Sequence, residues 1–126
     1  MTQKEFLIDT INHYNSSNRC SHQDGDCCYS PFTAGLEGKS EGCAIGRFME
    51  PEVALEMDNK HDLMNIRTLL NHEPDCISDW MKEFDIDFLT AIQNLHDADV
   101  YWNKQGLSEL GHEEVLKICK KFGIEL

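Results

Sequence analysis

The apolar residues of this chain recur at helical spacing in separate stretches, and that spacing limits the possible folds more than any other feature. One stretch begins around Asp85 to Asp87 and places its apolar side chains on one side of a helix, at Phe88, Leu89, Ile92, Leu95 and Ala98. Another runs from about Gly111 to Phe122, with lysines in its last turn and Gly123 as the expected C-cap. Each apolar stripe needs a surface to bury it, so the sequence predicts a mainly helical core.

Shorter patterns bring the expected total to about five helices. Thr2 and Glu5 have capping-box spacing, which predicts a helix from about Gln3 to Asn15. Helical pieces are also expected from Pro51 through Met57, from Leu63 to Leu70 and from Ile77 to Phe84. The 126 residues are enough for one core and too few for two, so a single domain is expected.

The segment from about residue 19 to residue 42 differs from the rest, because it is rich in Cys, Gly, Ser and Asp and poor in aliphatic residues. Such a composition cannot supply a helical stripe. A short strand is expected at Cys27 to Ser30, after which the chain would return to a partner strand, giving a small hairpin, or to a helix near Cys43 to Met49. The predicted fold class is α+β, mostly α, with a small β-hairpin or an irregular Cys-rich lobe on the helices.

The charge balance limits the kind of partner. There are 23 acidic residues against 11 Lys and Arg, a formal net charge of −12, which disfavours direct binding to a phosphate backbone. An acidic domain can instead dock on a basic protein surface. No apolar run approaches the roughly 20 residues that cross a bilayer, and no signal peptide is apparent, so a cytoplasmic location with reduced thiols is expected.

One candidate site is a structural zinc centre in the Cys-rich segment. Thiolate and imidazole ligands suit tetrahedral zinc, and a metal would stabilise a segment with little apolar content. The candidate ligands are Cys20, His22, Cys27, Cys28 and Cys43. Their spacing contains no C-x-x-C pair, so the alternative of partly buried free thiols stays open.

A second candidate is nucleophilic catalysis by Cys43 with His96 as its base. If a helix starts at Ala44, its N-terminus favours the Cys43 thiolate and offers amides to an oxyanion. Asp97 follows His96, but neighbouring residues on a helix point about 100° apart, which predicts that Asp97 is poorly placed to orient the imidazole. The two HD dipeptides, at His61 and His96, also permit comparison with helical metal-dependent phosphohydrolases, although further ligands are not clearly placed.

A third candidate is a small ligand of nucleotide type, held by Tyr29, Arg47 and Trp102. An aromatic face stacks on a base, and a nucleotide needs only one or two cations. The alternative for Trp102 is structural. This residue follows the clearest helix, so its indole can cap the core with its N–H on a carbonyl group.

The order of Cys27-Cys28-Tyr29, Gly42-Cys43-Ala44-Ile45-Gly46, Phe88-Leu89, His96-Asp97 and Trp102 resembles a family of small uncharacterised phage and bacterial proteins. The resemblance extends over about Phe6 to Phe122, although the Pro31 to Gly42 loop is longer here and an extra Cys precedes Tyr29. The family carries no established activity, so the resemblance implies a biological context and no mechanism. In that context the expected role is that of an accessory protein that modulates a host function. We therefore expect non-catalytic binding to a host protein or small ligand, with a Cys43–His96 hydrolase or transferase and a zinc-binding module as alternatives.

Overall fold

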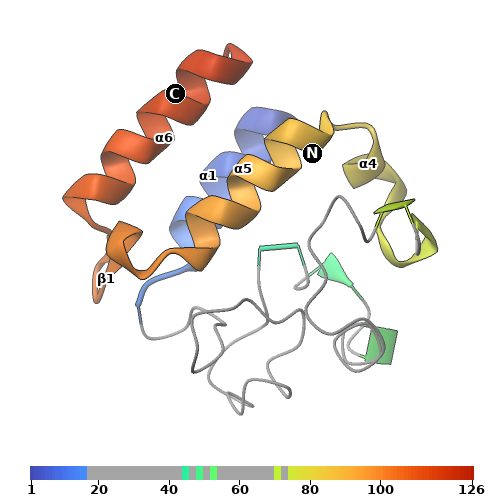
Figure 1. The fold of residues 1–126 in the computed structure, drawn as a ribbon, viewed down its shortest axis with the longest axis horizontal. Helices are drawn as coiled ribbons and strands as arrows, with labels where there is room; N and C mark the ends of the chain where they lie inside the picture. Colours follow the sequence, from blue (N-terminus) through green and yellow to red (C-terminus); the bar gives the residue numbers. More distant parts are fainter. Residues whose placement is uncertain (17–43, 46–47, 50–51, 54–69, 72–73) are drawn as a thin grey trace.

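The computed structural model describes residues 1–16, 44–45, 48–49, 52–53, 70–71 and 74–126. These ranges contain four α-helices and one small two-stranded antiparallel hairpin (Figure 1). The fold is α+β and mostly α, which confirms the predicted class. The predicted hairpin at Cys27 to Ser30 lies outside the described residues, as do most of the helical pieces expected between Pro51 and Leu70.

Helix α1 (Gln3–His13) begins with the predicted capping box. The Thr2 hydroxyl accepts a hydrogen bond from the Glu5 amide, and the Glu5 carboxylate accepts one from the Thr2 amide, both at 3.1 Å. Hydrogen bonding to the Thr2 backbone amide first, and then to the Thr2 side chain, lowers the pKa of the Glu5 carboxyl. The helix ends two residues before the predicted Asn15, because Tyr14 takes extended backbone angles.

The middle of the described chain holds the 3₁₀ turn η2 (Pro74–Cys76), the short helix α4 (Asp79–Lys82) and the long helix α5 (Ile86–Asp97). Asp85 is the N-cap of α5, and its carboxylate accepts a hydrogen bond from the Asp87 amide at 2.8 Å. The predicted start of this helix is therefore confirmed.

A compact connection reverses the chain after α5. It consists of the 3₁₀ turn η3 (Asp99–Tyr101) and the strands β1 (Trp102–Asn103) and β2 (Gly106–Leu107), in which Trp102 lies opposite Leu107. Helix α6 (Glu109–Phe122) follows, with Ser108 as N-cap and Gly123 as a left-handed C-cap. The sequence did not reveal this hairpin, because strands of two residues are too short to show alternation.

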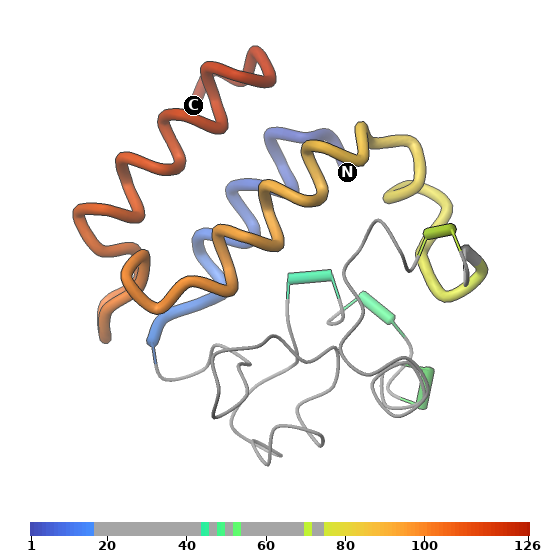
Figure 2. Tube along the Cα trace, in the orientation of Figure 1, coloured from blue at the N-terminus to red at the C-terminus, as the bar shows by residue number. Residues whose placement is uncertain are grey.

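Helices α1, α5 and α6 pack around a shared apolar interior. Helix α5 contacts both α1 and α6, and α5 and α6 run side by side in opposite directions (Figure 2). The Phe6 ring lies at the centre of an aromatic cluster, with ring centroids 5.6 to 6.3 Å from those of Phe48, Trp80, Phe84 and Phe88. Ala44 and Ile45 are buried in the same core.

The last helix buries one face against the core. Val115, Ile118 and Cys119 are buried, and Phe122 is half-buried against the core. Burial raises the pKa of the Cys119 thiol. Over the ranges that the structure describes, no helix combines the length and apolarity required to cross a membrane.

Candidate binding site

Of the sequence-predicted site residues, only His96 and Trp102 belong to the described part of the chain. The other catalytic, ligand-binding and zinc candidates lie outside it: Cys20, His22, Cys27, Cys28, Tyr29, Cys43 and Arg47. The described residues alone contain no group of three or more His, Cys, Asp or Glu side chains that could hold a metal ion. The zinc prediction and the Cys43–His96 pairing therefore stay predictions.

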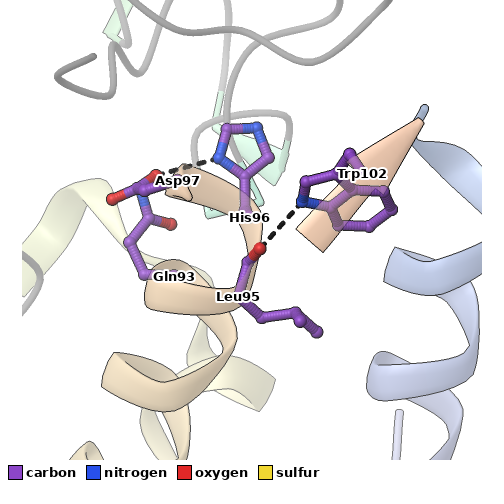
Figure 3. Close-up of polar contacts among 5 residues, drawn as sticks. All are labelled: Gln93, Leu95, His96, Asp97 and Trp102. Atoms are coloured by element: carbon purple, nitrogen blue, oxygen red, sulfur yellow. Dashed lines mark hydrogen bonds and ion pairs between the residues drawn. The ribbon is translucent and has the colours of Figure 1, made fainter. Parts of the chain in front are cut away.

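His96 lies in the last turn of α5 with 0% of its surface exposed. Its Nδ1 atom is 2.9 Å from Asp97 Oδ1 (Figure 3). Its ring packs edge-on against Tyr14 at a centroid distance of 4.7 Å. The prediction that Asp97 is poorly placed was wrong. The 100° offset separates only the Cα–Cβ bonds, and at the last residue of α5 the carboxylate turns toward the imidazole.

The Asp97 carboxylate has a second contact one helical turn back. Gln93 Nε2 lies 3.5 Å from Asp97 Oδ1, a contact between positions i and i+4 of the same helix. Gln93 is buried, whereas the Asp97 side chain is 31% exposed. The three side chains form a polar group at the C-terminal end of α5, in which the carboxylate orients the imidazole.

Trp102 closes the same end of the helix. Its Nε1–H donates a hydrogen bond of 2.8 Å to the Leu95 carbonyl, and the residue is 5% exposed (Figure 3). The Leu95 carbonyl belongs to the last turn of α5, where carbonyl groups need partners from outside the helix. The structural interpretation of Trp102, with its N–H on a carbonyl group, is thus confirmed. Its role in a ligand site with Tyr29 and Arg47 stays a prediction.

Trp102→Phe is expected to lower the free energy of unfolding by about 1 to 2 kcal/mol, because the buried Leu95 carbonyl loses its donor. Urea unfolding measures this change. The matched control is Trp80→Phe, the same replacement at a half-buried indole of the aromatic cluster, where a smaller loss is expected. Equal losses in the two variants would contradict a special role for the Nε1–Leu95 bond.

A groove runs along the contact between α5 and α6 and encloses about 270 Å³. Its residues come from both helices: Asp87, Thr90, Ala91 and Asn94 from α5, and Glu114, Lys117, Ile118, Lys121 and Phe122 from α6. The apolar members are Ala91, Ile118 and Phe122, and the remaining lining residues are polar or charged. The groove thus combines apolar surface with charged and hydrogen-bonding groups, as binding sites do.

The charges of the groove are concentrated on α6. Lys117 Nζ lies 3.9 Å from Glu114 Oε2, and Lys121 Nζ lies 5.4 Å from the centre of the Phe122 ring. Glu114 also faces Tyr101. The pKa of the Tyr101 hydroxyl is raised by desolvation first, and then by the negative charge and the hydrogen bond of Glu114. Glu114 therefore already has two neighbours, while the lysines extend toward solvent.

Sequence reasoning missed this groove. The pattern identified the lysines near the end of α6 as partners of the helix dipole, which is a local role. It contained no information on which α5 residues lie across from them, because that depends on how two helices pack. The only available signal was Lys117 and Lys121 at a spacing of four, on the same side of the predicted helix.

No protein-family model, no curated protein and no solved structure matches this chain. Any function assigned to it rests on its own residues and on their geometry.

Proposed function

We propose that this protein acts by non-catalytic binding of a partner protein, and that the α5–α6 groove receives part of that partner. The main support is the groove itself, which combines apolar Ala91, Ile118 and Phe122 with charged rims. Both helices that form it are fixed to the core by buried side chains, including Phe88 and Val115. A site on such elements can bind without losing much conformational entropy.

The position of His96 supports binding over catalysis. A general base must come within hydrogen-bond reach of the group whose proton it removes. His96 is 0% exposed and packs against Tyr14. In this proposal the His96 imidazole and Asp97 stabilise the C-terminal end of α5, and Cys43 is not required for function.

One observation favours a second candidate, a hydrolase or transferase that uses Cys43 and His96. The Asp97 carboxylate lies 2.9 Å from His96 Nδ1, the placement that orients a catalytic imidazole in a triad. The two candidates differ in which side chain they require: the groove lysines for binding, and the Cys43 thiol for catalysis.

The setting proposed for the partner is a bacterial host cell, in line with the resemblance to small phage and bacterial proteins. The test is capture of a partner from bacterial lysate by four forms of the tagged protein: wild type, Cys43→Ala, the double variant Lys117→Glu with Lys121→Glu, and Lys120→Glu. Lys120 is exposed, neighbours Lys121 and does not line the groove, so it is the control for a charge reversal on α6 outside the groove.

The wild-type, Cys43→Ala and Lys120→Glu proteins are expected to retain one common partner, identified by mass spectrometry and remeasured by calorimetry with purified components. The double variant is expected to bind it at least about tenfold more weakly, because two favourable charges become repulsive. Undiminished binding by a folded double variant would exclude the groove. If Cys43→Ala alone among the variants abolished partner capture, the catalytic candidate would be favoured.

A further inference from the structure

We infer that the α5–α6 groove recognises a short peptide segment of its partner in which a large apolar side chain stands beside a carboxylate. This inference rests on the proposed function and names the chemistry of the occupant. It follows from three features of the groove: its size, the two ammonium groups on α6, and the uncharged polar side chains of Thr90 and Asn94 on α5.

The size indicates one inserted side chain. At about 270 Å³ the groove lies just below the range of about 300 to 1,000 Å³ typical of small-molecule cavities, which also enclose most of their ligand. An open groove of this size suits a single aromatic or branched aliphatic side chain carried by a larger partner. The Phe122 ring is held edge-to-face against Phe88 at 5.3 Å, so one wall is a fixed aromatic surface.

The cations indicate a carboxylate next to that side chain. Lys117 and Lys121 are one helical turn apart on α6, and both line the groove. Within the described ranges Lys121 forms no ion pair with a carboxylate, and Lys117 reaches Glu114 only at 3.9 Å with its side chain 76% exposed. A carboxylate placed between the two ammonium groups would gain charge-assisted hydrogen bonds.

The net charge of −12 restricts the occupant to few negative charges. Repulsion by the rest of the protein acts over a screening length of about 8 Å at physiological ionic strength, so a polyanion is excluded while a single carboxylate between two lysines is favoured. Asp87, in the first turn of α5, lines the groove across from α6 and further disfavours a second carboxylate on that side.

The α5 rim supplies uncharged groups for a peptide backbone. Thr90 Oγ1 donates a hydrogen bond of 2.8 Å to the Ile86 carbonyl, which directs its oxygen lone pairs outward as acceptors. Asn94 is exposed one turn further along and carries both an acceptor and donors. A peptide lying along Thr90 and Asn94 can therefore pair its main-chain groups while its side chain enters the groove.

The test uses three blocked pentapeptides and backbone amide shifts of the ¹⁵N-labelled full chain. The first peptide, acetyl-Ser-Ser-Phe-Asp-Ser-amide, is expected to shift the amides of α5 and α6 around the groove. Two matched peptides replace Phe with Ala, or Asp with Lys, and each is expected to bind about tenfold more weakly or not at all. In the protein, Lys121→Glu is expected to weaken binding of the first peptide about tenfold, and Lys120→Glu is expected to weaken it by less than about twofold.

Equal binding of the Ala or the Lys peptide, shifts away from α5 and α6, or equal effects of Lys121→Glu and Lys120→Glu would each overturn the inference. Failure of this inference can be distinguished from failure of the proposed binding function. If partner capture depends on the groove lysines but the first peptide does not bind, the binding function stands and the acidic–apolar occupant is wrong.

Discussion

Replacing Phe6 with alanine is expected to lower the free energy of unfolding by about 3 to 5 kcal/mol, the cost of removing a buried aromatic side chain. Phe6 is fully buried, and its ring touches four other aromatic rings that come from separate parts of the chain. Its loss leaves a cavity that Phe48, Trp80, Phe84 and Phe88 cannot all collapse into. Urea unfolding followed by circular dichroism measures the change.

A second variant keeps this prediction testable if the first does not fold, since domains of this size have only about 5 to 15 kcal/mol of stability. Phe6→Leu retains apolar volume but loses the ring contacts, and is expected to lose about 1 to 2 kcal/mol. The control is Leu116→Ala on α6, where the side chain is 67% exposed and a change within about 0.5 kcal/mol is expected. A Phe6→Ala loss as small as that of Leu116→Ala would show that the cluster does not centre on Phe6.

The long helices were predictable because their signals are local and agree with one another. Asp85 caps α5 and Gly123 ends α6. The apolar stripe predicted on α5 is buried at Phe88, Leu89, Ile92 and Leu95. Thr2 and Glu5 likewise form the capping box that their spacing predicts. In each case the residues that determine the structure lie within one or two helical turns of each other.

The features that escaped prediction depend on contacts between elements or at their ends. The hairpin of Trp102–Asn103 with Gly106–Leu107 contains too few residues for a period to appear. Asp97 contacts His96 through its carboxylate, which the 100° offset between neighbouring Cα–Cβ bonds does not prevent. The groove exists because Lys117 and Lys121 lie across from Thr90 and Asn94, a pairing that the packing of α5 on α6 produces.

Replacing Gly111 with alanine is also expected to lower the free energy of unfolding strongly, although it adds only one methyl group. Gly111 lies in the first turn of α6, where alanine would ordinarily favour the helix by about 1 kcal/mol over glycine. Here an added Cβ would overlap the Tyr101 carbonyl oxygen and lie 2.8 Å from Leu107 Cδ2. The sign of the usual effect should therefore reverse.

The oxygen that the new methyl group would meet cannot easily move. The Tyr101 carbonyl accepts a hydrogen bond of 2.8 Å from the Ser108 amide, and Ser108 also caps α6 by accepting from the Gly111 amide at 3.1 Å. Moving either group breaks the connection that holds η3 against the start of α6. Gly111→Ala is expected to lower the free energy of unfolding by about 3 kcal/mol, near the upper end of overpacking costs.

Gly123→Ala provides the matched control for this prediction, since it is the same substitution at the other end of α6. Gly123 has a φ of 68° and no heavy atom within 4 Å of an added Cβ, so alanine there meets only the backbone cost of about 1 kcal/mol. Denaturant unfolding of both variants compares a steric with a purely conformational effect. Because α6 supplies one wall of the groove, a Gly111→Ala protein that is as stable as Gly123→Ala would mean that η3 does not fix α6 in the position on which the groove depends.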